Sequence, residues 1–365
     1  MVARKQSTST GTAPYLYSID AGNGTGKGMS SETSLPITVE PVIAPLTEKR
    51  GLSEEAEHPE FSLTQNGKTL VFGVKDVFEH GKRDSIRRLS SIERYTSADW
   101  FALIDVLFLH IFAGRRGAAE FAPTGIISLP VSVYNDKTIV DQVKANLLGK
   151  HEISDYEGCT LRIELDPKRL MIMPESAGAM FHFVYDPKTL AARKQASATG
   201  TTLLIDIGYE TTDLSLFEGM SYQRDRSFTI TRAGMGTVAR QIQEYASQLV
   251  GHVDVSRVDV GLRALAGLTS DLKQIEVAPG VYVDVSSVYD YEVEMLANRI
   301  ADDVRTRYAK SITRALLGGG GAYHLAKKLR KLLPYQIIEI VPDADLANVW
   351  GAFTFLSMKA QGKAD

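Results

Sequence analysis

"YLYSIDAGNGTGKGMSSET", residues 15–33, places glycines, a lysine and a threonine directly after an apolar strand that ends at Asp20. Such a loop is typical of a phosphate site, because glycine lets backbone N–H groups approach phosphate oxygens closely. The letters fit neither common phosphate motif. A P-loop aligned on Gly26-Lys27 needs Gly where this chain has Ala21, and Ser or Thr where it has Gly28. The pattern G-x-G-x-x-G fails too, because its last position falls on Lys27 or Met29 in place of Gly.

The residues after this loop predict a strand, although both common motifs require a helix there. Residues 30–45, "SSETSLPITVEPVIAP", are rich in Thr, Val, Ile and Pro with rough alternation. The unit is therefore a strand, a glycine loop and a second strand, which together form a phosphate-holding hairpin. The same pattern of an apolar strand, an Asp-x-Gly turn and a second strand recurs in "TTLLIDIGYETTDLSLFEGM", residues 201–220. Two such halves predict a duplicated fold in which hairpins from both sides grip phosphates in a cleft.

Length and composition describe an ordinary globular protein. The 365 residues are enough for two domains, and the hydrophobic content is 44% with 23% charged residues. The formal net charge of −3 offers no cationic excess for direct nucleic-acid binding, so a DNA cargo would need an adaptor. The single cysteine, Cys159, excludes an internal disulfide.

No segment of the chain predicts a membrane span or a signal peptide. The apolar window Trp100–Gly114 contains Asp105 and His110 and is shorter than the ~20 residues that a span needs. We expect a buried helix there, with Ser97 or Asp99 as its N-cap. The N-terminus lacks the apolar core of a signal peptide, so we expect a flexible tail and a cytoplasmic protein.

Five segments, in this order and at this spacing, resemble the actin / Hsp70 / sugar-kinase ATPase superfamily. The first and second phosphate loops are matched by "IDAGNGTGK" and "LLIDIGYETTDLSLF". The segment that positions the attacking water is matched by "MPESAGAM", the nucleoside loop by "LLGGGGAYHL", and the helix that links the C-terminus back to the first domain by "ANVWGAFTF". Within the superfamily the chain is most similar to the bacterial and archaeal actin-like proteins of the plasmid-segregation ParM/StbA type, since "PESAGA" carries Glu where eukaryotic actin has Gln.

This resemblance implies an α/β fold of two actin-like (ribonuclease H-like) domains with a nucleotide cleft between them. The expected order is a flexible tail over 1–14, domain I over 15–190 and domain II over 201–340. A C-terminal helix, about 345–365, is expected to pack back on domain I.

Two aspartates are the candidate metal ligands. Asp20 and Asp206 each follow a strand and precede a glycine, so their carboxylates should project into the cleft and hold Mg²⁺ mainly through its waters. A turn-stabilising role is the alternative for both. Asp213 could assist the metal or the water, or could be a hydrogen-bonded structural carboxylate.

The resemblance also assigns catalysis and the nucleotide contacts. Glu175, with Asp206, is the expected catalytic residue, which orients the attacking water and accepts its proton; the alternative is a glutamate that only interacts with the helix dipole. Lys27 could bind phosphate or remain solvated. The expected contacts to ATP or GTP are Gly22, Asn23, Gly24, Thr25, Lys27, Gly208, Tyr209, Glu210, Thr211, Thr212, Gly234, Gly236, Gly318, Gly319, Gly320 and Gly321.

The expected function is that of a nucleotide-dependent, filament-forming ATPase that moves or segregates plasmid DNA through a DNA-binding adaptor. The alternatives are a non-polymerising small-molecule kinase or phosphatase of the same superfamily, and a structural cytoskeletal filament. Two basic stretches could be solvated surface or filament contacts. One is a predicted helix over 83–95 with Arg83, Arg87 and Arg88, and the other contains Lys327, Lys328, Arg330 and Lys331.

Overall fold

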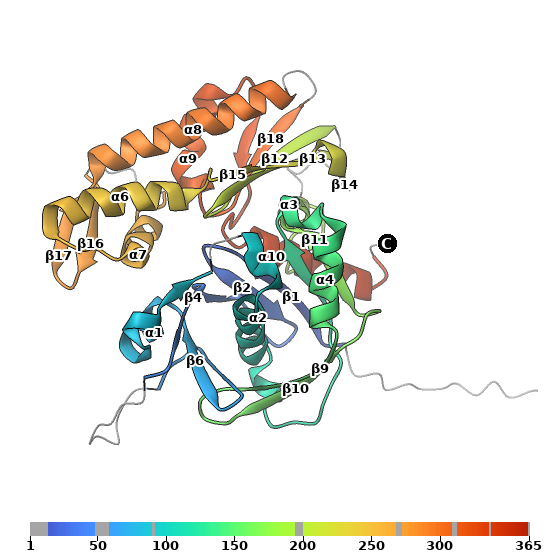
Figure 1. The fold of residues 1–365 in the computed structure, drawn as a ribbon. Helices are drawn as coiled ribbons and strands as arrows, with labels where there is room; N and C mark the ends of the chain where they lie inside the picture. Colours follow the sequence, from blue (N-terminus) through green and yellow to red (C-terminus); the bar gives the residue numbers. More distant parts are fainter. Residues whose placement is uncertain are drawn as a thin grey trace, which may run out of the picture.

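The protein has two lobes, one on each side of a central pair of helices (Figure 1). The first lobe contains strands β1 to β11, and the second contains β12 to β19. The computed structural model describes residues 14–47, 58–89, 92–193, 200–267, 272–308, 312–335 and 337–363. The expected flexible tail, apart from residue 14, therefore lies outside the described residues.

The central sheet of the first lobe has five strands in the order β11-β8-β1-β2-β3. The first three strands in the chain form an antiparallel meander, and the other two add on parallel to β1. Every residue of β1 is buried, as its apolar sequence predicts. The strands are β1 (Leu16–Ala21), β2 (Gly26–Ser30), β3 (Ile37–Val39), β8 (Thr124–Leu129) and β11 (Leu170–Pro174).

The second lobe repeats this topology. Strand β12 pairs antiparallel with β13, which pairs antiparallel with β15, and β18 and β19 add on parallel to β12. The registers also agree, because Asp20 lies opposite Lys27 while Asp206 lies opposite Asp213. The strands are β12 (Thr201–Ile207), β13 (Thr211–Glu218), β14 (Ser221–Tyr222), β15 (Phe228–Thr231), β18 (Arg314–Gly318) and β19 (Ile338–Ile340).

The remaining strands lie outside the two central sheets (Figure 1). The first lobe also contains a six-stranded sheet, β10-β9-β5-β6-β4-β7, and the second also contains the hairpin of β16 and β17. Strands β5 and β6 are joined by a tight turn at Asn66-Gly67, whose φ angles are 51° and 72°. These strands are β4 (Val42–Pro45), β5 (Ser62–Gln65), β6 (Lys68–Phe72), β7 (Arg87–Arg88), β9 (Gly149–Ser154), β10 (Thr160–Leu165), β16 (Gln274–Ala278) and β17 (Val281–Asp284).

The α-helices cover the sheets and connect the lobes. They are α1 (Val74–His80), α2 (Ala98–Ile111), α3 (Val131–Tyr134), α4 (Lys137–Leu147), α5 (Glu175–Val184), α6 (Met235–Val250), α7 (Val255–Leu265), α8 (Ser286–Tyr308), α9 (Ala322–Leu332) and α10 (Ala347–Ala360). The predicted core helix is α2, and Ser97 is its N-cap, accepting a hydrogen bond from the backbone N–H of Trp100.

The predicted helix over 83–95 is wrong. In its place are a 3-10 turn over Arg83–Ser85, the short strand β7 and a 3-10 helix over Ile92–Thr96. The two arginines of β7 pair with β4, so the backbone of this segment satisfies its hydrogen bonds by joining a sheet edge. Arg87 and Arg88 form separate ion pairs, with Asp99 and Asp259 respectively, and do not share one helical face.

Two glycines of the opening motif permit helix packing and do not belong to the loop. Gly26 and Gly28 lie in β2, directly over α2. A Cβ atom on Gly26 would come within 3.2 Å of Leu103, and one on Gly28 within 3.1 Å of Ile111. The glycine loop itself is therefore the four residues between β1 and β2, and α2 packs against the hairpin that carries it.

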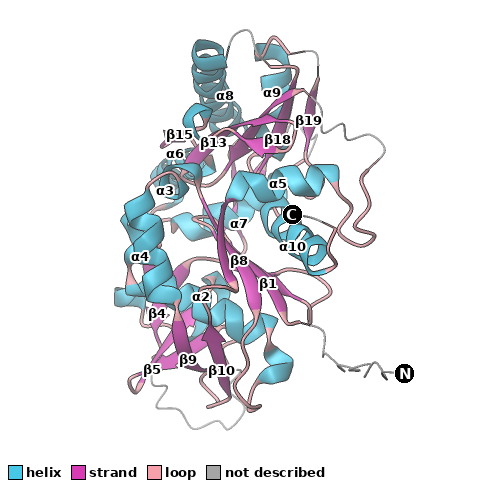
Figure 2. Cartoon of the chain, turned by 90° about the vertical axis from the view of Figure 1, so that its right-hand side faces the viewer, coloured by secondary structure: helices cyan, strands magenta, loops and turns pink. Residues whose placement is uncertain are grey.

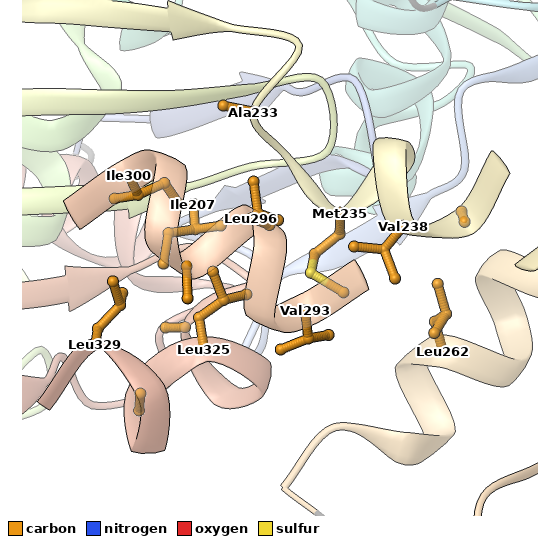
Figure 3. Close-up of a cluster of buried hydrophobic side chains, with 14 of the residues drawn as sticks. Ile207, Ala233, Met235, Val238, Leu262, Val293, Leu296, Ile300, Leu325 and Leu329 are labelled. Atoms are coloured by element: carbon orange, nitrogen blue, oxygen red, sulfur yellow. The ribbon is translucent and has the colours of Figure 1, made fainter. Parts of the chain in front are cut away.

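The core of the second lobe lies between its sheet and helices α6 to α9 (Figure 3). Ile207, at the end of β12, lies among Leu296 from α8 and Leu325 from α9 (Figure 3). A Cβ atom on Gly321 would come within 2.3 Å of the Ile207 side chain, so the glycine run before α9 packs directly against the end of β12. This packing fixes the backbone directly after Asp206.

Helices α5 and α10 cross between the lobes (Figure 2). Helix α5 follows a strand of the first lobe but packs on the second-lobe sheet, whereas α10 follows a strand of the second lobe and packs on β1 and β8. The helices touch at Gly178 and Gly351. A Cβ atom on Gly351 would lie 1.7 Å from the Gly178 carbonyl oxygen, so only glycine fits at this crossing.

We predict that Gly351→Ala destabilises the protein, because its methyl group would collide with backbone that cannot move aside. The expected loss in the free energy of unfolding is ~1 to 3 kcal/mol or more, the usual cost of overpacking. Urea unfolding measures it. Gly114→Ala is the matched control, since the nearest atom to its Cβ would be the end of the Glu32 side chain at 3.4 Å. Equal unfolding midpoints for Gly351→Ala and wild type would contradict the close crossing.

Candidate functional site

A cavity of about 350 Å³ lies between the lobes and is lined by both. Its volume falls in the range of small-molecule sites. The two hairpin loops meet here, because a Cβ atom on Gly24 would come within 3.0 Å of the Tyr209 side chain. The predicted site residues that line the cavity are Asp20, Gly22, Asn23, Gly24, Thr25, Lys27, Glu175, Asp206, Gly208, Tyr209, Thr211, Gly319, Gly320 and Gly321.

Five predicted nucleotide contacts do not line the cavity: Glu210, Thr212, Gly234, Gly236 and Gly318. Glu210 forms an ion pair with Arg240, and the Thr212 hydroxyl donates to the Ala233 carbonyl. Gly318 is the last residue of β18.

Gly234 and Gly236 make room for Tyr209. A Cβ atom would lie 2.3 Å from the Tyr209 carbonyl oxygen at Gly234, and 2.6 Å from the Tyr209 ring at Gly236. The structure therefore places these two glycines around a residue that lines the cavity.

Two buried side chains that the sequence analysis missed hold the first loop. Arg94 donates hydrogen bonds to the carbonyl oxygens of Ala21 and Gly22, at 2.8 and 3.2 Å. The Trp100 indole N–H also donates to the Ala21 carbonyl, at 3.2 Å. Neither side chain lines the cavity, so both fix the loop from outside it.

The floor of the cavity concentrates buried negative charge. Asp20 and Asp206 are 1% and 6% exposed, and the Lys27 ammonium lies 3.2 Å from Asp20 Oδ2. Burial opposes the charge on Lys27, but the carboxylates of Asp20, Glu175 and Asp206 outweigh it and raise the Lys27 pKa. One ammonium thus faces three carboxyl groups.

Two of these carboxyl groups, those of Asp206 and Glu175, have raised pKa values. Burial raises the pKa of Asp206 to about 6, even though a hydrogen bond from Asn348 acts in the opposite direction. Burial, together with the charges of Asp20, Asp213 and Asp206, raises the pKa of Glu175 well above its ordinary value. A bound cation would relieve this repulsion.

Asp213 occupies a structural position. Its Oδ2 accepts a hydrogen bond from the Val131 N–H at 2.8 Å, and its Oδ1 accepts one from the Thr229 hydroxyl at 2.6 Å. Val131 begins α3 of the first lobe, so this carboxyl group joins the two lobes behind the cavity. Of the two interpretations of Asp213, its contacts support the hydrogen-bonded structural carboxylate.

Asn348 is a cavity residue that the sequence analysis did not single out. It lies in the first turn of α10, lines the cavity, and donates from Nδ2 to Asp206 Oδ2 at 3.1 Å. The resemblance assigns to the segment "ANVWGAFTF" only a helix that packs on the first domain. A polar residue in the first turn of an otherwise apolar helix was the signal available.

Ion pairs between the lobes form another wall of the cavity. Arg88 of β7 pairs with Asp259 of α7, and its guanidinium lies 4.3 Å from the centre of the Tyr209 ring. The Tyr209 hydroxyl donates to Asp259 at 3.2 Å. Glu40 and Arg263 add a second pair at 3.0 Å. Arg88 is therefore a partly buried cavity residue, and the solvated face expected for it is wrong.

The acidic groups suit a cation that keeps much of its own water. Within the described ranges, no group of three or more His, Cys, Asp or Glu side chains is arranged to hold a metal ion. Asp20 Oδ1 is nevertheless buried and accepts no hydrogen bond from the described residues. Hard carboxylate oxygens of this kind suit Mg²⁺, which binds through one or two carboxylates, phosphate oxygens and water.

Comparisons with known proteins identify the fold. The family model "archaeal actin homologue MreB-like, C-terminal" matches residues 204–331. No curated protein matches the chain in sequence. The solved actin-like protein Alp7A aligns over 95% of this chain and 97% of its own, with a TM-score of 0.71 and 15% identity.

Two further structures agree. A ParM from a 15-stranded filament of Clostridium botulinum aligns over 95% of this chain and 100% of its own, with a TM-score of 0.71 and 17% identity. The archaeal actin homolog Ta0583, in complex with ADP, aligns over 94% of this chain and 99% of its own, with a TM-score of 0.69 and 18% identity. The chain thus has the two-domain actin fold, and the predicted fold class is confirmed. No described helix has both the length and the apolar character to cross a membrane.

We predict that the protein without ligand loses stability as the pH rises from about 4 to 7. Burial raises the pKa of Asp213 to about 7 in the folded protein, whereas an unfolded aspartate titrates near ~4. Between these two pKa values the folded state retains the proton of Asp213 while the unfolded state releases it. The stabilisation is therefore fully present below the unfolded pKa and is lost as the pH rises through the folded pKa.

Asp213→Asn should therefore flatten the decline of the urea midpoint between pH 5 and pH 8. Asp225→Asn, at an exposed carboxylate in the second lobe, is the control and should keep the wild-type slope. Parallel curves for Asp213→Asn and wild type would contradict the assignment.

Proposed function

We propose that this actin-fold protein binds and hydrolyses ATP or GTP with Mg²⁺ in the cavity between its lobes. We further propose that it assembles into filaments that move or segregate plasmid DNA in the cytoplasm through a DNA-binding adaptor. The observation that carries the proposal is the pairing of two equivalent hairpins, which bring the buried carboxylates of Asp20 and Asp206 to one cavity beside Glu175. Actin-like neighbours solved with ADP, or as a filament, support it.

In the proposed site, the loops at Gly22–Thr25 and Gly208–Thr211 bind the phosphates through backbone N–H groups and hydroxyls. Lys27 balances part of the phosphate charge. Asp20 and Asp206 hold Mg²⁺ mainly through water, and the bound ion supplies positive charge at the phosphoryl group being transferred. The glycine run at 319–321 lines the cavity before α9, and its backbone would contact the nucleoside.

Glu175 is the proposed general base. It is the first residue of α5, where the helix dipole favours a negative charge. The repulsion that raises its pKa comes partly from Asp20 and Asp206. A cation held beside Asp20 and Asp206 would offset those charges and lower the pKa of Glu175, so that its carboxylate could accept the proton of the attacking water.

The position of the proposed site would couple the bound nucleotide to filament assembly. The cavity is lined by both lobes, so a nucleotide that contacts both favours one arrangement of the lobes over others. Loss of the terminal phosphate changes those contacts and therefore the surface offered to a neighbouring copy. Because the net charge is −3, we propose that an adaptor, and not the filament itself, contacts DNA.

We expect Mg-ATP or Mg-GTP to raise the light scattering of the purified protein, and the signal to decay as phosphate is released. Mg-ADP and Mg-GDP should leave it low. Right-angle scattering and a phosphate assay in the same sample measure both quantities. Flat scattering at several protein concentrations, with turnover only after a metabolite is added, would point to a small-molecule kinase. Filaments that persist after nucleotide is exhausted would point to a structural filament.

Glu175→Gln keeps the size of the side chain but cannot accept a proton. Phosphate release should slow by ~10²- to 10⁴-fold, the usual contribution of a general base, while nucleotide binding and assembly persist. Glu218→Gln, at an exposed residue that pairs with Arg226, is the matched control. Wild-type turnover in Glu175→Gln would remove Glu175 from the mechanism.

A further inference from the structure

Glu175 and Asn348 occupy equivalent places in the two halves of the fold. Helix α5 follows β11 and α10 follows β19, and these strands hold the same position in their sheets. The helices cross at Gly178 and Gly351. Glu175 lies three residues before the first of these glycines, and Asn348 lies three residues before the second. Duplication therefore places one polar side chain from each helix at the cavity, a carboxyl group in one half and an amide in the other.

The amide group of Asn348 forms a hydrogen bond with Asp206. Both side chains are buried, at 5% and 6% exposed, and Nδ2 of Asn348 donates to Oδ2 of Asp206 at 3.1 Å. A hydrogen bond to a charged acceptor in a buried site is stronger than a neutral one, and its geometry limits the rotation of the carboxylate. The bond therefore sets which oxygen of Asp206 remains available to other ligands.

An amide is the group that this position requires. Asp20, Glu175 and Asp206 already face a single ammonium, so a fourth carboxylate would add repulsion. An apolar residue would leave Asp206 Oδ2 without its donor, which is costly for a buried charge. Asn348 supplies the donor without adding charge.

The same bond connects the lobes. Helix α10 packs on the first lobe through Ala352 and Leu356, while Asp206 belongs to the second. One residue beyond Asn348, the Ser18 hydroxyl of β1 donates to the Val349 carbonyl at 2.8 Å. The first turn of α10 is thus held by β1 on one side and by Asp206 on the other.

We propose that Asn348 is a positioning residue for the magnesium–nucleotide site, which holds the Asp206 carboxylate in the orientation that binds the hydrated ion. This inference rests on the proposed function. It assigns to the second half of the fold a role that complements that of Glu175. One helix contributes the base, and the other orients the metal ligand.

The test measures the affinity of the full-length protein for fluorescent mant-ADP in excess Mg²⁺ and again in EDTA. Asn348→Ala removes the donor, and Asn348→Leu removes it while keeping a side chain branched at the same atom. Both should lose about 10- to 100-fold in affinity in Mg²⁺, the usual effect of removing a partner that orients a metal ligand. Affinity in EDTA should change little, so the ratio of the affinity in Mg²⁺ to the affinity in EDTA should fall.

Ser18→Ala is the matched control, because it removes the neighbouring anchor of α10 without touching the cavity lining. It should lower the melting temperature but keep the wild-type ratio. A wild-type ratio in both Asn348 variants would overturn the positioning role and leave nucleotide binding intact. An equal fall in Ser18→Ala would overturn it too, since any loosening of α10 would then suffice. Wild-type protein that binds no mant-ADP would overturn the proposed function as well.

Discussion

The close crossing of α5 and α10 is the constraint on which the rest of the structure depends. Each helix leaves a strand of one lobe and packs on the sheet of the other, so neither lobe is complete without the other's helix. The contact is possible only because Gly178 and Gly351 carry no side chains. It brings the first turns of both helices to the same cavity, where Glu175 and Asn348 face the aspartates of the two hairpins. The geometry of the candidate site is thus a consequence of helix packing.

The cavity contains buried carboxyl groups and is also lined by ion pairs that join the two lobes. Three carboxyl groups and one lysine at its floor leave an excess of negative charge that burial makes unfavourable. Ion pairs formed by Arg88 and Glu40 with α7 join the lobes at another wall. A charged ligand with its cation would therefore act on the electrostatics of the floor and on the relative position of the lobes at once.

The sequence was informative wherever chemistry and local structure coincide. The two Asp-x-Gly hairpins identified the duplicated fold, and Asp20, Lys27, Glu175 and Asp206 do meet at one cavity. Contacts between distant segments could not be predicted. Arg94 holds a loop more than 70 residues away in the chain, and Asn348 meets Asp206 across 142 residues. The helix expected over 83–95 failed because charge spacing says nothing about pairing with β4. Gly26 and Gly28 looked like loop residues, because the sequence does not show that α2 packs beneath them.

The position of the helix crossing also gives the molecule a mechanical property. It lies between the lobes, while β9 and β10 of the first lobe and β16 and β17 of the second lie far from it (Figure 1). In a rigid rotation, displacement grows with distance from the axis. A rotation of the lobes about the crossing that shifted the cavity residues only slightly would therefore move these distant strands much farther. A small change at the cavity would be largest in the parts of each lobe that lie farthest from Gly178 and Gly351.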